Sequence, residues 1–595
     1  MVARELRAVG VRQVYAPVIN ITRDQRWGRG QESYGEDVLL NSRMGVAYVK
    51  ALQEGGVVAT PKHYVDNYGE GGHDSFASVT SWRELREVYL EPFRACVQEG
   101  GARGIMSSYN SVDGVPSSAN QKLLRDILKD EWGFKGIVVS DYGAVEIIHG
   151  SHRMAASDED ALAMSLEAGM DLQLANTSKG LLELVKSGKV SRKTLDEAVS
   201  RVLRIKFELG LFDNPLVAPE AAELLVRCPE HRELAYESAV KSMTLLKNNG
   251  ILPLKGVRRI GLYGPAADVV TLGDYSGGRG GWKGEGAISP YEGLKQAFDG
   301  QVLLNPDPRS CDVLLFFPSI LEEEGQDRSS FRLPSAHMTV REKTSAVIIA
   351  DQQENRVKVD QEKMLRDLMA TGKPVVVVLH NGAVVEITDW VYGAAAVLEA
   401  WYPGEQGGRA IADVLTGVRN PGGRLPFSWV RTIGQNPYYY SIKPSGRGYG
   451  YVENDGSPLY PFGYGLSYTS FEYSGFELPS ELKAGENLRV RVTVTNTGAV
   501  EGDEVVQLYA HDELACVARP LKELMAFKRI TLAPGESREV ELEVPYSRFS
   551  LWDTNMVQRV EEGWFEVWLG RNADEKVTGG RVYVKSVNRK SQDIK

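Results

Sequence analysis

The first third of the chain alternates short apolar runs with amphipathic stretches of helical period. Each run has the length of a β-strand, and parallel strands joined by helices produce this alternation. A closed barrel of the TIM type has eight strands, and only about five runs are found here, with the shortage at the N-terminal side. The sequence therefore predicts an incomplete TIM-like barrel, whose strand candidates are "VRQVYAPVI" (11–19), "GVVATPKHY" (56–64), "RGIMSSYN" (103–110), "GIVVSDY" (136–142) and "MDLQLA" (170–175).

Polar residues stand at the ends of these apolar runs. They are Asn20, Lys62 with His63, Asn110 and Asp141. In a TIM barrel the residues at the carboxyl ends of the strands line the active site. Burying an unpaired carboxylate is expensive, so Asp141, at the end of a run built for burial, is predicted to be either paired structurally or used chemically.

The pattern changes twice further along the chain. After an amphipathic helix that ends near Gly210 and Pro215, a second series of strands and helices predicts an α/β sandwich. Its "GPAAD" segment lacks the glycine spacing of a dinucleotide site. From about residue 472 the period becomes two, which is typical of a β-sandwich of about 100 residues.

These changes divide the chain into a mixed α/β protein of three domains. No exposed aromatic row is visible in the last domain, so a supporting role is favoured there over carbohydrate binding. The predicted boundaries are 1–212 for the truncated barrel, 213–232 for a linker, 233–432 for the α/β sandwich, 433–471 for a connector, 472–585 for the β-sandwich and 586–595 for a tail.

Composition and charge exclude several classes of protein. The 595 residues are 43% hydrophobic and 25% charged, as in an ordinary globular protein, and the net charge of −10 argues against nucleic acid as a partner. Four scattered cysteines predict neither a disulfide framework nor a zinc site. The apolar runs are too short to span a membrane. No signal peptide is visible, so the location is cytoplasmic if residue 1 is the true start, and otherwise it stays open.

Three loops carry candidate chemistry. "RDQRWGRGQESYGED" (23–37) is either a solvated charged loop or, because it follows a barrel strand, a contact surface for a substrate. Lys62 beside His63 is interpreted as structural or as binding with equal weight. "LEEEGQDRSSFRLP" (321–334) is a charged loop unless one of its glutamates donates a proton. The histidines of "HGSH" (149–152) lack further ligands and indicate a surface turn.

Six motifs in register resemble the family 3 glycoside hydrolases over essentially the whole chain. They are "RWGRGQESYGED", "KHY", "GIMSSYNSVDGVPSSAN", "GIVVSDYGAV", "EGQDR" and "AWYPGEQGGRAIADVLTGVRNPGGRLPFSW". That family combines a TIM-like barrel, an α/β sandwich and often a fibronectin III-like domain, which are the three segments predicted above. The resemblance implies a retaining exo-β-glycosidase that releases terminal β-D-glucosyl or β-D-xylosyl residues, with β-glucosidase slightly favoured.

The resemblance also implies roles for individual residues. Asp141 corresponds to the catalytic nucleophile, and Glu324 to the acid/base contributed by the second domain, whereas Glu322, Glu323 and Glu405 fit less well. Arg29 (paired in sequence with Glu32), Lys62 and His63 are similar to residues that hydrogen-bond the sugar in the −1 subsite. Met106, Tyr109 and Tyr142 fall where the family shapes that subsite, and Ser276 is a weaker candidate from the second domain.

Glycosidase chemistry sets requirements for the two acids. The carboxyl groups of a retaining enzyme lie about 5–5.5 Å apart, one attacking and one protonating. Asp141 must be ionised, which Lys62 and Arg29 would favour, and Glu324 must begin protonated. No metal or organic cofactor is required. The substrate is an oligosaccharide or glycoside.

The sequence departs from the family at its start. The upstream strands, one of which carries an aspartate that binds the sugar, have no counterpart, so the chain is predicted to be truncated or, alternatively, shortened and compensated by forming a homo-oligomer. Two other functions stay open. One is a catalytically impaired carbohydrate-binding relative. The other is a β-N-acetylglucosaminidase that uses a His–Asp dyad, for which His73 and Asp74 are the candidates although their order is reversed.

Overall fold

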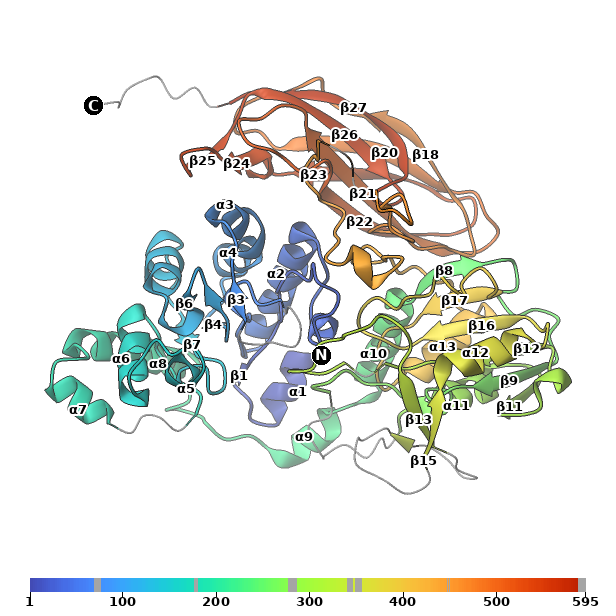
Figure 1. Ribbon diagram of the computed structural model, residues 1–595, viewed down its shortest axis with the longest axis horizontal. Coiled ribbons are helices and arrows are strands. Elements are labelled where there is room, and N and C mark those ends of the chain that lie inside the picture. Colours follow the sequence, from blue (N-terminus) through green and yellow to red (C-terminus); the bar gives the residue numbers. More distant parts are fainter. Residues whose placement is uncertain are drawn as a thin grey trace. The chain divides into compact units, whose positions relative to one another are not determined.

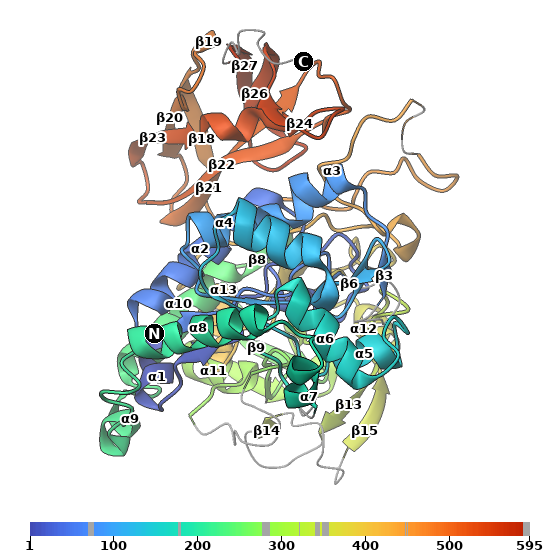
Figure 2. The ribbon, with the colours of Figure 1, turned by 90° about the vertical axis from the view of Figure 1, so that its left-hand side faces the viewer.

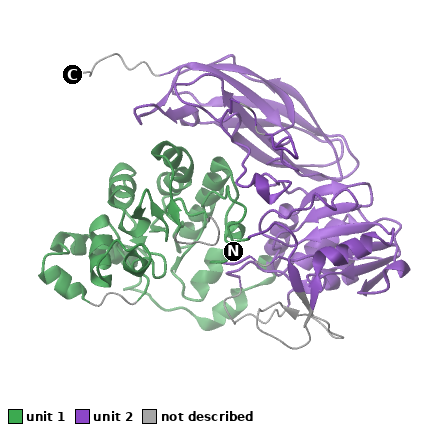
Figure 3. Ribbon diagram, viewed as in Figure 1, with its two compact units in different colours: residues 1–231, 324–328 green, residues 232–323, 329–595 purple. Residues whose placement is uncertain are grey.

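The computed structural model describes residues 1–68, 76–175, 180–276, 286–320, 322–339, 346–347, 356–446, 448 and 450–586 (Figures 1 and 2). The chain forms two compact units. Unit 1 contains residues 1–231 and 324–328, and unit 2 contains residues 232–323 and 329–595 (Figure 3). A five-residue segment from the middle of the chain therefore belongs to the N-terminal unit.

Parallel strand segments follow one another across unit 1 in chain order. Strand β1 (Gln13–Val14) pairs with β2 (Val58–Ala59), and β4 (Gly104–Met106) pairs with β7 (Ile137–Val139), all in parallel. Single parallel bridges extend the series, from Val18 to Lys62, from Tyr64 to Ser107 and from Val139 to Leu172. The fifth predicted run, 170–175, thus contributes only one bridge. Within the described residues no pairing joins the fifth segment to the first, so the barrel stays open.

Helices connect these segments and bury their apolar faces against them. The side chains of Asp37, Ser157 and Ser191 accept backbone N–H bonds at the start of three of them, as N-cap residues do. The helices are α1 (Val2–Ala8), α2 (Val38–Glu54), α3 (Trp82–Glu84), η2 (Leu85–Tyr89), α4 (Glu91–Gln98), η4 (Lys122–Glu131), α5 (Glu146–Gly150), α6 (Asp158–Ala168), α7 (Leu181–Lys186), α8 (Arg192–Glu208) and α9 (Pro219–Leu225), and a small sheet contains β3 (Ala77–Ser78), β5 (Ser111–Val112) and β6 (Val115–Pro116).

Unit 2 begins with a six-stranded sheet in the order β11-β9-β12-β16-β17-β8, parallel except for β8. Two separate apolar cores cover its faces, one reaching α10, α11 and α13 and the other reaching α12. The elements are α10 (Pro229–Ser242), β8 (Thr244–Asn248), β9 (Arg259–Tyr263), α11 (Pro290–Ala297), β11 (Gln301–Leu304), β12 (Val313–Phe316), α12 (Gln361–Met369), β16 (Val375–Leu379), β17 (Ala396–Glu399) and α13 (Gly407–Thr416).

The last part of unit 2 is a sandwich of two sheets, β18-β20-β23 and β19-β27-β26-β21-β22. Alternate residues of β20 are buried, which is the period of two that the sequence shows. The strands are β18 (Phe471–Glu477), β19 (Glu481–Leu482), β20 (Leu488–Asn496), β21 (Gly502–Asp512), β22 (Glu523–Leu532), β23 (Ser537–Val544), β26 (Gly563–Gly570) and β27 (Lys576–Val584), and a short hairpin contains β24 (Ser550–Trp552) and β25 (Gln558–Val560).

The shorter elements complete the described chain. In the described residues no helix is both long and apolar enough to cross a membrane. The remaining strands are β10 (Val269–Val270), β13 (Ser335–Thr339), β14 (Ala346–Val347) and β15 (Arg356–Asp360), and the remaining short helices are η1 (Gly30–Glu32), η3 (Ser117–Ala119), η5 (Pro308–Ser310), η6 (Ile433–Gln435) and η7 (Tyr546–Phe549).

Candidate active site

Asp141 and His63 meet at the carboxyl edge of the open barrel. Asp141 lies two residues after the last residue of β7. His63 lies four residues after the last residue of β2, and β4 runs between these two strands. The carboxyl ends of parallel strands share one edge of a sheet, which brings these side chains together. His63 Nε2 lies 3.4 Å from Asp141 Oδ2, and both residues are buried.

Burial and neighbouring charge act in opposite directions on Asp141. Burial raises the pKa of Asp141, whereas the Tyr142 N–H, which donates to Oδ1 at 2.7 Å, and the charges of Arg29 and Lys62 lower it. The net pKa lies above the ordinary value of 3.8. Arg29 and Lys62 thus favour the ionised form, as the sequence predicts, but they do not outweigh desolvation.

The same site holds His63 neutral. Burial, followed by the charges of Arg29 and Lys62, lowers the pKa of His63 well below 6.5. Burial also lowers the pKa of Lys62, opposed by the carboxylates of Glu32, Asp141 and Glu324. The charges of these side chains therefore act on one another within a single cluster.

Asn20 determines which nitrogen of His63 carries the proton. The Asn20 side-chain amide nitrogen donates to the His63 carbonyl at 2.9 Å, and Asn20 Oδ1 accepts from the His63 backbone N–H at 2.7 Å. These two bonds establish which end of the Asn20 amide is the oxygen. The same Oδ1 lies 3.1 Å from His63 Nδ1, which must then be the protonated nitrogen. The lone pair of Nε2 consequently faces Asp141 Oδ2.

Arg29 joins two carboxylates of the site. Its Nε and Nη2 donate to the two oxygens of Glu32 at 2.6 and 3.2 Å, and its Nη1 donates to Glu324 Oε1 at 2.8 Å. The side chain of Arg29 is 2% exposed, whereas those of Glu32 and Glu324 are 14% and 19% exposed. A buried guanidinium held in a bidentate pair presents its remaining donor in a defined direction.

The segment that carries Glu324 is fastened to unit 1. The Gly28 N–H donates to Asp327 Oδ1 at 2.9 Å, and the Arg328 N–H donates to the Arg26 carbonyl at 2.7 Å. Glu324 was expected from the second domain, and its chain does continue from β12 of unit 2. The residues 324–328 themselves pack in unit 1, because these bonds attach them to the loop after β1.

Comparison with known proteins identifies the whole chain. Residues 1–205 match the glycosyl hydrolase family 3 N-terminal domain, residues 243–468 its C-terminal domain, and residues 504–573 a fibronectin type III-like domain. The chain is 36% identical to a periplasmic β-glucosidase of Salmonella typhimurium, with 94% of this chain and 79% of the relative covered. It is 37% identical to a β-xylosidase of Formosa agariphila, with 96% and 83% covered.

The chain belongs to glycosyl hydrolase family 3. It is a glycoside hydrolase, and the predicted fold class is confirmed. A crystal structure of a mutant β-glucosidase from Listeria innocua in complex with laminaribiose superposes with a TM-score of 0.89 at 31% identity, covering 98% of this chain and 83% of that one. The domain boundaries proposed from the sequence stay predictions.

The structure of this glycosidase places the predicted binding residues at different positions. Met106 is buried at the end of β4. Tyr109 donates its hydroxyl to the Tyr142 carbonyl at 3.0 Å and also lowers the pKa of Asp141, whereas Tyr142 itself is 71% exposed. His152, predicted on a surface turn, is half-buried, and its Nε2 lies 2.8 Å from the Tyr109 carbonyl.

The remaining candidates lie in unit 2 or outside the described residues. Ser276 is exposed in unit 2, and Glu322, Glu323 and Glu405 also lie in unit 2. His73 and Asp74 fall outside the described residues. In the described part of the chain no group of three histidine, cysteine or carboxylate side chains could hold a metal ion.

Two residues of the site had no role assigned from the sequence. Asn20 was noted only as a polar strand end, and its contact with His63 depends on the pairing of two strands that are 43 residues apart. Asp327 lies in the "EGQDR" motif, but its acceptor role for the Gly28 N–H depends on a loop 299 residues away. Strand-end position was the available signal for Asn20, and motif membership for Asp327.

Proposed function

We propose that this glycosidase is a retaining exo-β-glycosidase with Asp141 as nucleophile and Glu324 as acid/base. The observation that carries the proposal is the cluster at the carboxyl edge of the barrel. It combines a buried aspartate, a neutral histidine and an arginine that joins a second, partly exposed carboxylate. Glycoside hydrolysis in retaining enzymes uses two carboxyl groups of this kind.

The proposed reaction has two steps, formation and hydrolysis of a covalent glycosyl-enzyme. In the first, an Asp141 oxygen bonds to the anomeric carbon as the bond to the leaving oxygen breaks, and Glu324 gives its proton to that oxygen. In the second, Glu324 takes a proton from water, the water oxygen bonds to the anomeric carbon and the bond to Asp141 breaks. The separation of the two carboxyl groups, about 5–5.5 Å in retaining enzymes, stays a prediction for this chain.

The ion pair between Arg29 and Glu324 bears on the first step. Pairing with a guanidinium favours the ionised carboxylate, whereas the acid role needs a protonated carboxyl. We therefore infer that the sugar replaces Glu324 as the acceptor for Arg29 Nη1, with a hydroxyl taking the position of the carboxylate oxygen. Glu32 keeps the guanidinium in place throughout, because it holds the other edge of the fork.

The glycone is proposed to be β-D-glucose or β-D-xylose, with glucose slightly favoured. Relatives named β-glucosidase and β-xylosidase match this chain at similar identity, so identity does not separate the two sugars. The two sugars differ by one hydroxymethyl group, which a pocket discriminates only weakly. Formation of a homo-oligomer also stays a proposal, which light scattering of the purified chain tests.

A mechanism-based fluorosugar tests the assignment of Asp141. We expect a 2-deoxy-2-fluoro-β-glycosyl fluoride to inactivate the enzyme in a time-dependent manner, and peptide mass analysis to find the sugar on Asp141. A label on another side chain, or none with either sugar although aryl β-glycosides are cleaved, would refute the nucleophile. A panel of aryl β-glycosides assayed beside it assigns the glycone, and no release from any of them would favour the catalytically impaired relative.

A further inference from the structure

Two aromatic side chains stand together on the outer face of the fibronectin-like sheet. The register of β26 and β27 sets Trp564 opposite Tyr583, and their ring centroids are 5.1 Å apart at 71°. Trp564 is 41% exposed, and Tyr583 is half-buried. We call this pair, with the charged residues around it, the Trp564 platform.

The same face of this sheet shows what a structural aromatic pair looks like. Trp568 lies four residues further along β26, and its side chain therefore points to the same face. It stacks on Tyr509 of β21, with ring centroids 6.0 Å apart. Both are buried, because Tyr440 and Phe462 of the connector pack on this pair or next to it. In the described part of the chain no aromatic ring of the connector packs on Trp564, which stays 41% exposed, so packing alone does not explain a tryptophan there.

Charged side chains form an ordered ring around the platform. Arg581 lies over Trp564, with its Cζ 4.6 Å from the ring centroid, and donates to both oxygens of Glu513 at 2.7 and 2.5 Å. Tyr583 donates its hydroxyl to Glu562 at 3.0 Å, and Lys585 lies over the Tyr583 ring with its Nζ 4.7 Å from the centroid. Each of these polar groups therefore has a hydrogen-bond or ion-pair partner beside the platform.

The chemistry of the platform points to one class of ligand. The platform contains two cations, Arg581 and Lys585, and three carboxylates. Arg581 pairs with Glu513, and Lys585 lies 3.6 Å from Glu562 and 3.8 Å from Glu481. This near balance of charge does not favour a polyanion. The exposed surface of the two rings and the neighbouring Leu514 is also much smaller than the roughly 800 Å² that each partner buries in a stable protein interface.

We propose that the Trp564 platform binds a neutral oligosaccharide chain at a site separate from the catalytic residues. A sugar ring offers an apolar face of the size of one aromatic ring and hydroxyls at its rim, and aromatic side chains with polar neighbours bind such amphipathic surfaces. The platform would hold a longer glycan near the enzyme while Asp141 and Glu324 act on a chain end. This inference depends on the proposed function in one respect, the expectation that the ligand is a carbohydrate.

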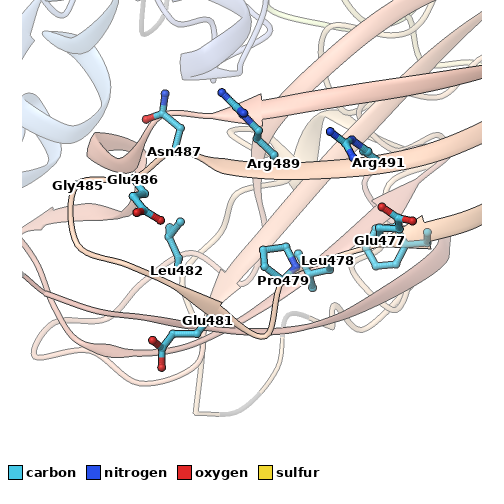
Figure 4. A pocket seen from close by; sticks show the side chains of 11 residues that line it. Glu477, Leu478, Pro479, Glu481, Leu482, Gly485, Glu486, Asn487, Arg489 and Arg491 are labelled. Atoms are coloured by element: carbon cyan, nitrogen blue, oxygen red, sulfur yellow. The ribbon is translucent and has the colours of Figure 1, made fainter.

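A hollow in the same domain is a poor alternative. It measures about 950 Å³ and lies beside β19, lined by the residues shown in Figure 4. Its lining contains three glutamates and two arginines but only one aromatic ring, that of Phe476. Phe476 packs partly buried against the apolar core of the domain, so the hollow lacks the pair of aromatic rings that makes the platform suited to a sugar. The hollow supplies a control position, Arg489.

Affinity electrophoresis of the full chain in gels containing a neutral soluble β-glucan or β-xylan tests the proposal. Every sample carries Asp141→Asn, so that the polymer stays intact, and an excess of monosaccharide occupies the catalytic subsite. We expect retardation of this parent by at least one of the two polymers. Trp564→Ala and Tyr583→Ala should each weaken the binding about tenfold, which corresponds to about 1.4 kcal/mol.

Two controls keep the result interpretable. Tyr392→Ala removes an aromatic ring that is even more exposed than Trp564 from another part of unit 2, and Arg489→Ala changes the hollow, so both should run like the parent. Thermal unfolding shows whether each variant is folded. In the background with Asp141 intact, Trp564→Ala should cleave aryl glycosides at the parent rate, so failure of the catalytic proposal is read separately.

Three outcomes would overturn the inference. One is a parent that neither polymer retards, and another is a folded Trp564→Ala variant that binds as tightly as the parent. The third is a change of oligomeric state in Trp564→Ala with glycan binding unchanged, because the platform would then be covered by a second copy of the chain.

Discussion

Both parallel sheets of this glycosidase end in buried ionisable residues, but only one of them makes a reactive cluster. At the edge of the sandwich sheet, Glu399 ends β17 and His380 follows β16, and both are almost fully buried. Glu399 accepts from the Trp401 N–H at 2.7 Å and from the Asn381 amide at 3.0 Å. Burial raises the pKa of Glu399 well above its usual range, and it lowers that of His380 to about 3, so His380 is neutral at pH 7.

The barrel edge differs in the mixture of its charges and in their exposure. Arg29 and Lys62 stand among Asp141, Glu32 and Glu324, and the carboxylates keep some contact with solvent. Burial of a polar strand end therefore does not by itself indicate a site. Opposite charges that stay partly accessible distinguish the edge that can do chemistry from the edge that is sealed.

Substitution of the two buried acids should separate the edges most strongly. We expect Asp141→Asn to lower kcat/KM by about 10⁴-fold or more, because the covalent step loses its nucleophile. The matched change Glu399→Gln should alter kcat/KM by less than about twofold, because Glu399 takes no part in either proposed step. Steady-state kinetics on an aryl β-glucoside and a β-xyloside measure both, and comparable losses in the two variants would remove the distinction.

The acid role of Glu324 should show in the dependence on the leaving group. We expect Glu324→Gln to lower kcat/KM by about 10²–10⁴-fold for an alkyl glycoside and far less for a dinitrophenyl glycoside, whose leaving group needs no proton. Glu323→Gln, one residue earlier and exposed, is the control. An equal loss for both substrates would contradict the acid role, and a loss confined to His73→Ala would favour the histidine dyad.

The contact between Asn20 and His63 should have a smaller effect. Asn20→Ala removes the acceptor that holds the Nδ1 proton, and we expect kcat/KM to fall about tenfold, the size of one or two hydrogen bonds. Asn20→Asp should instead raise the pKa of His63, because a carboxylate favours the imidazolium. ¹⁵N NMR of the imidazole nitrogens reads both changes, and an unaltered His63 tautomer in Asn20→Ala would disprove the role of Asn20.

The charge of Lys62 should move the acidic limb of the pH profile. Burial places the pKa of Asp141 above 3.8, so the acidic limb of kcat/KM should lie above that pH. Lys62 lowers the pKa of Asp141, and Lys62→Met should therefore move the limb to higher pH, in addition to any loss of sugar binding. A limb that moves to lower pH in this variant would show that desolvation by Lys62 outweighs its charge.

The smallest expected effect is on the stability of the sealed edge. The folded pKa of Glu399 is raised, so the protein gives up stability at this group as pH rises above 4.5, the ordinary glutamate value. The difference in Tm between Glu399→Gln and the parent should therefore increase in favour of the variant from pH 5 to pH 8, by about 2–4 °C for each kcal/mol. A difference that stays constant over this range would mean that Glu399 is ionised in the folded protein.

Much of the site could be predicted because strand ends and motifs are local. The apolar run before Asp141 and the pair Lys62–His63 indicate the edge on which they lie, since the side chains at the ends of parallel strands share that edge. The strand at 170–175 was less well predicted, because pairing reduces it to a bridge at Leu172. The platform was missed, because Trp564 and Tyr583 are neighbours only through the register of two strands.

The amino-acid sequence by itself determined the order of the three domains, the strand-end positions of Asp141, Lys62 and His63, and the motif that contains Glu324. These depend on periodicity and on residues adjacent in the chain. Only the tertiary structure decided that Asn20 holds the proton of His63, that Arg29 joins Glu324 to Glu32, and that Glu399 is sealed while Asp141 is not. Protonation states and long-range bonds depend on burial and on partners far away in sequence, which arise only when the chain has folded.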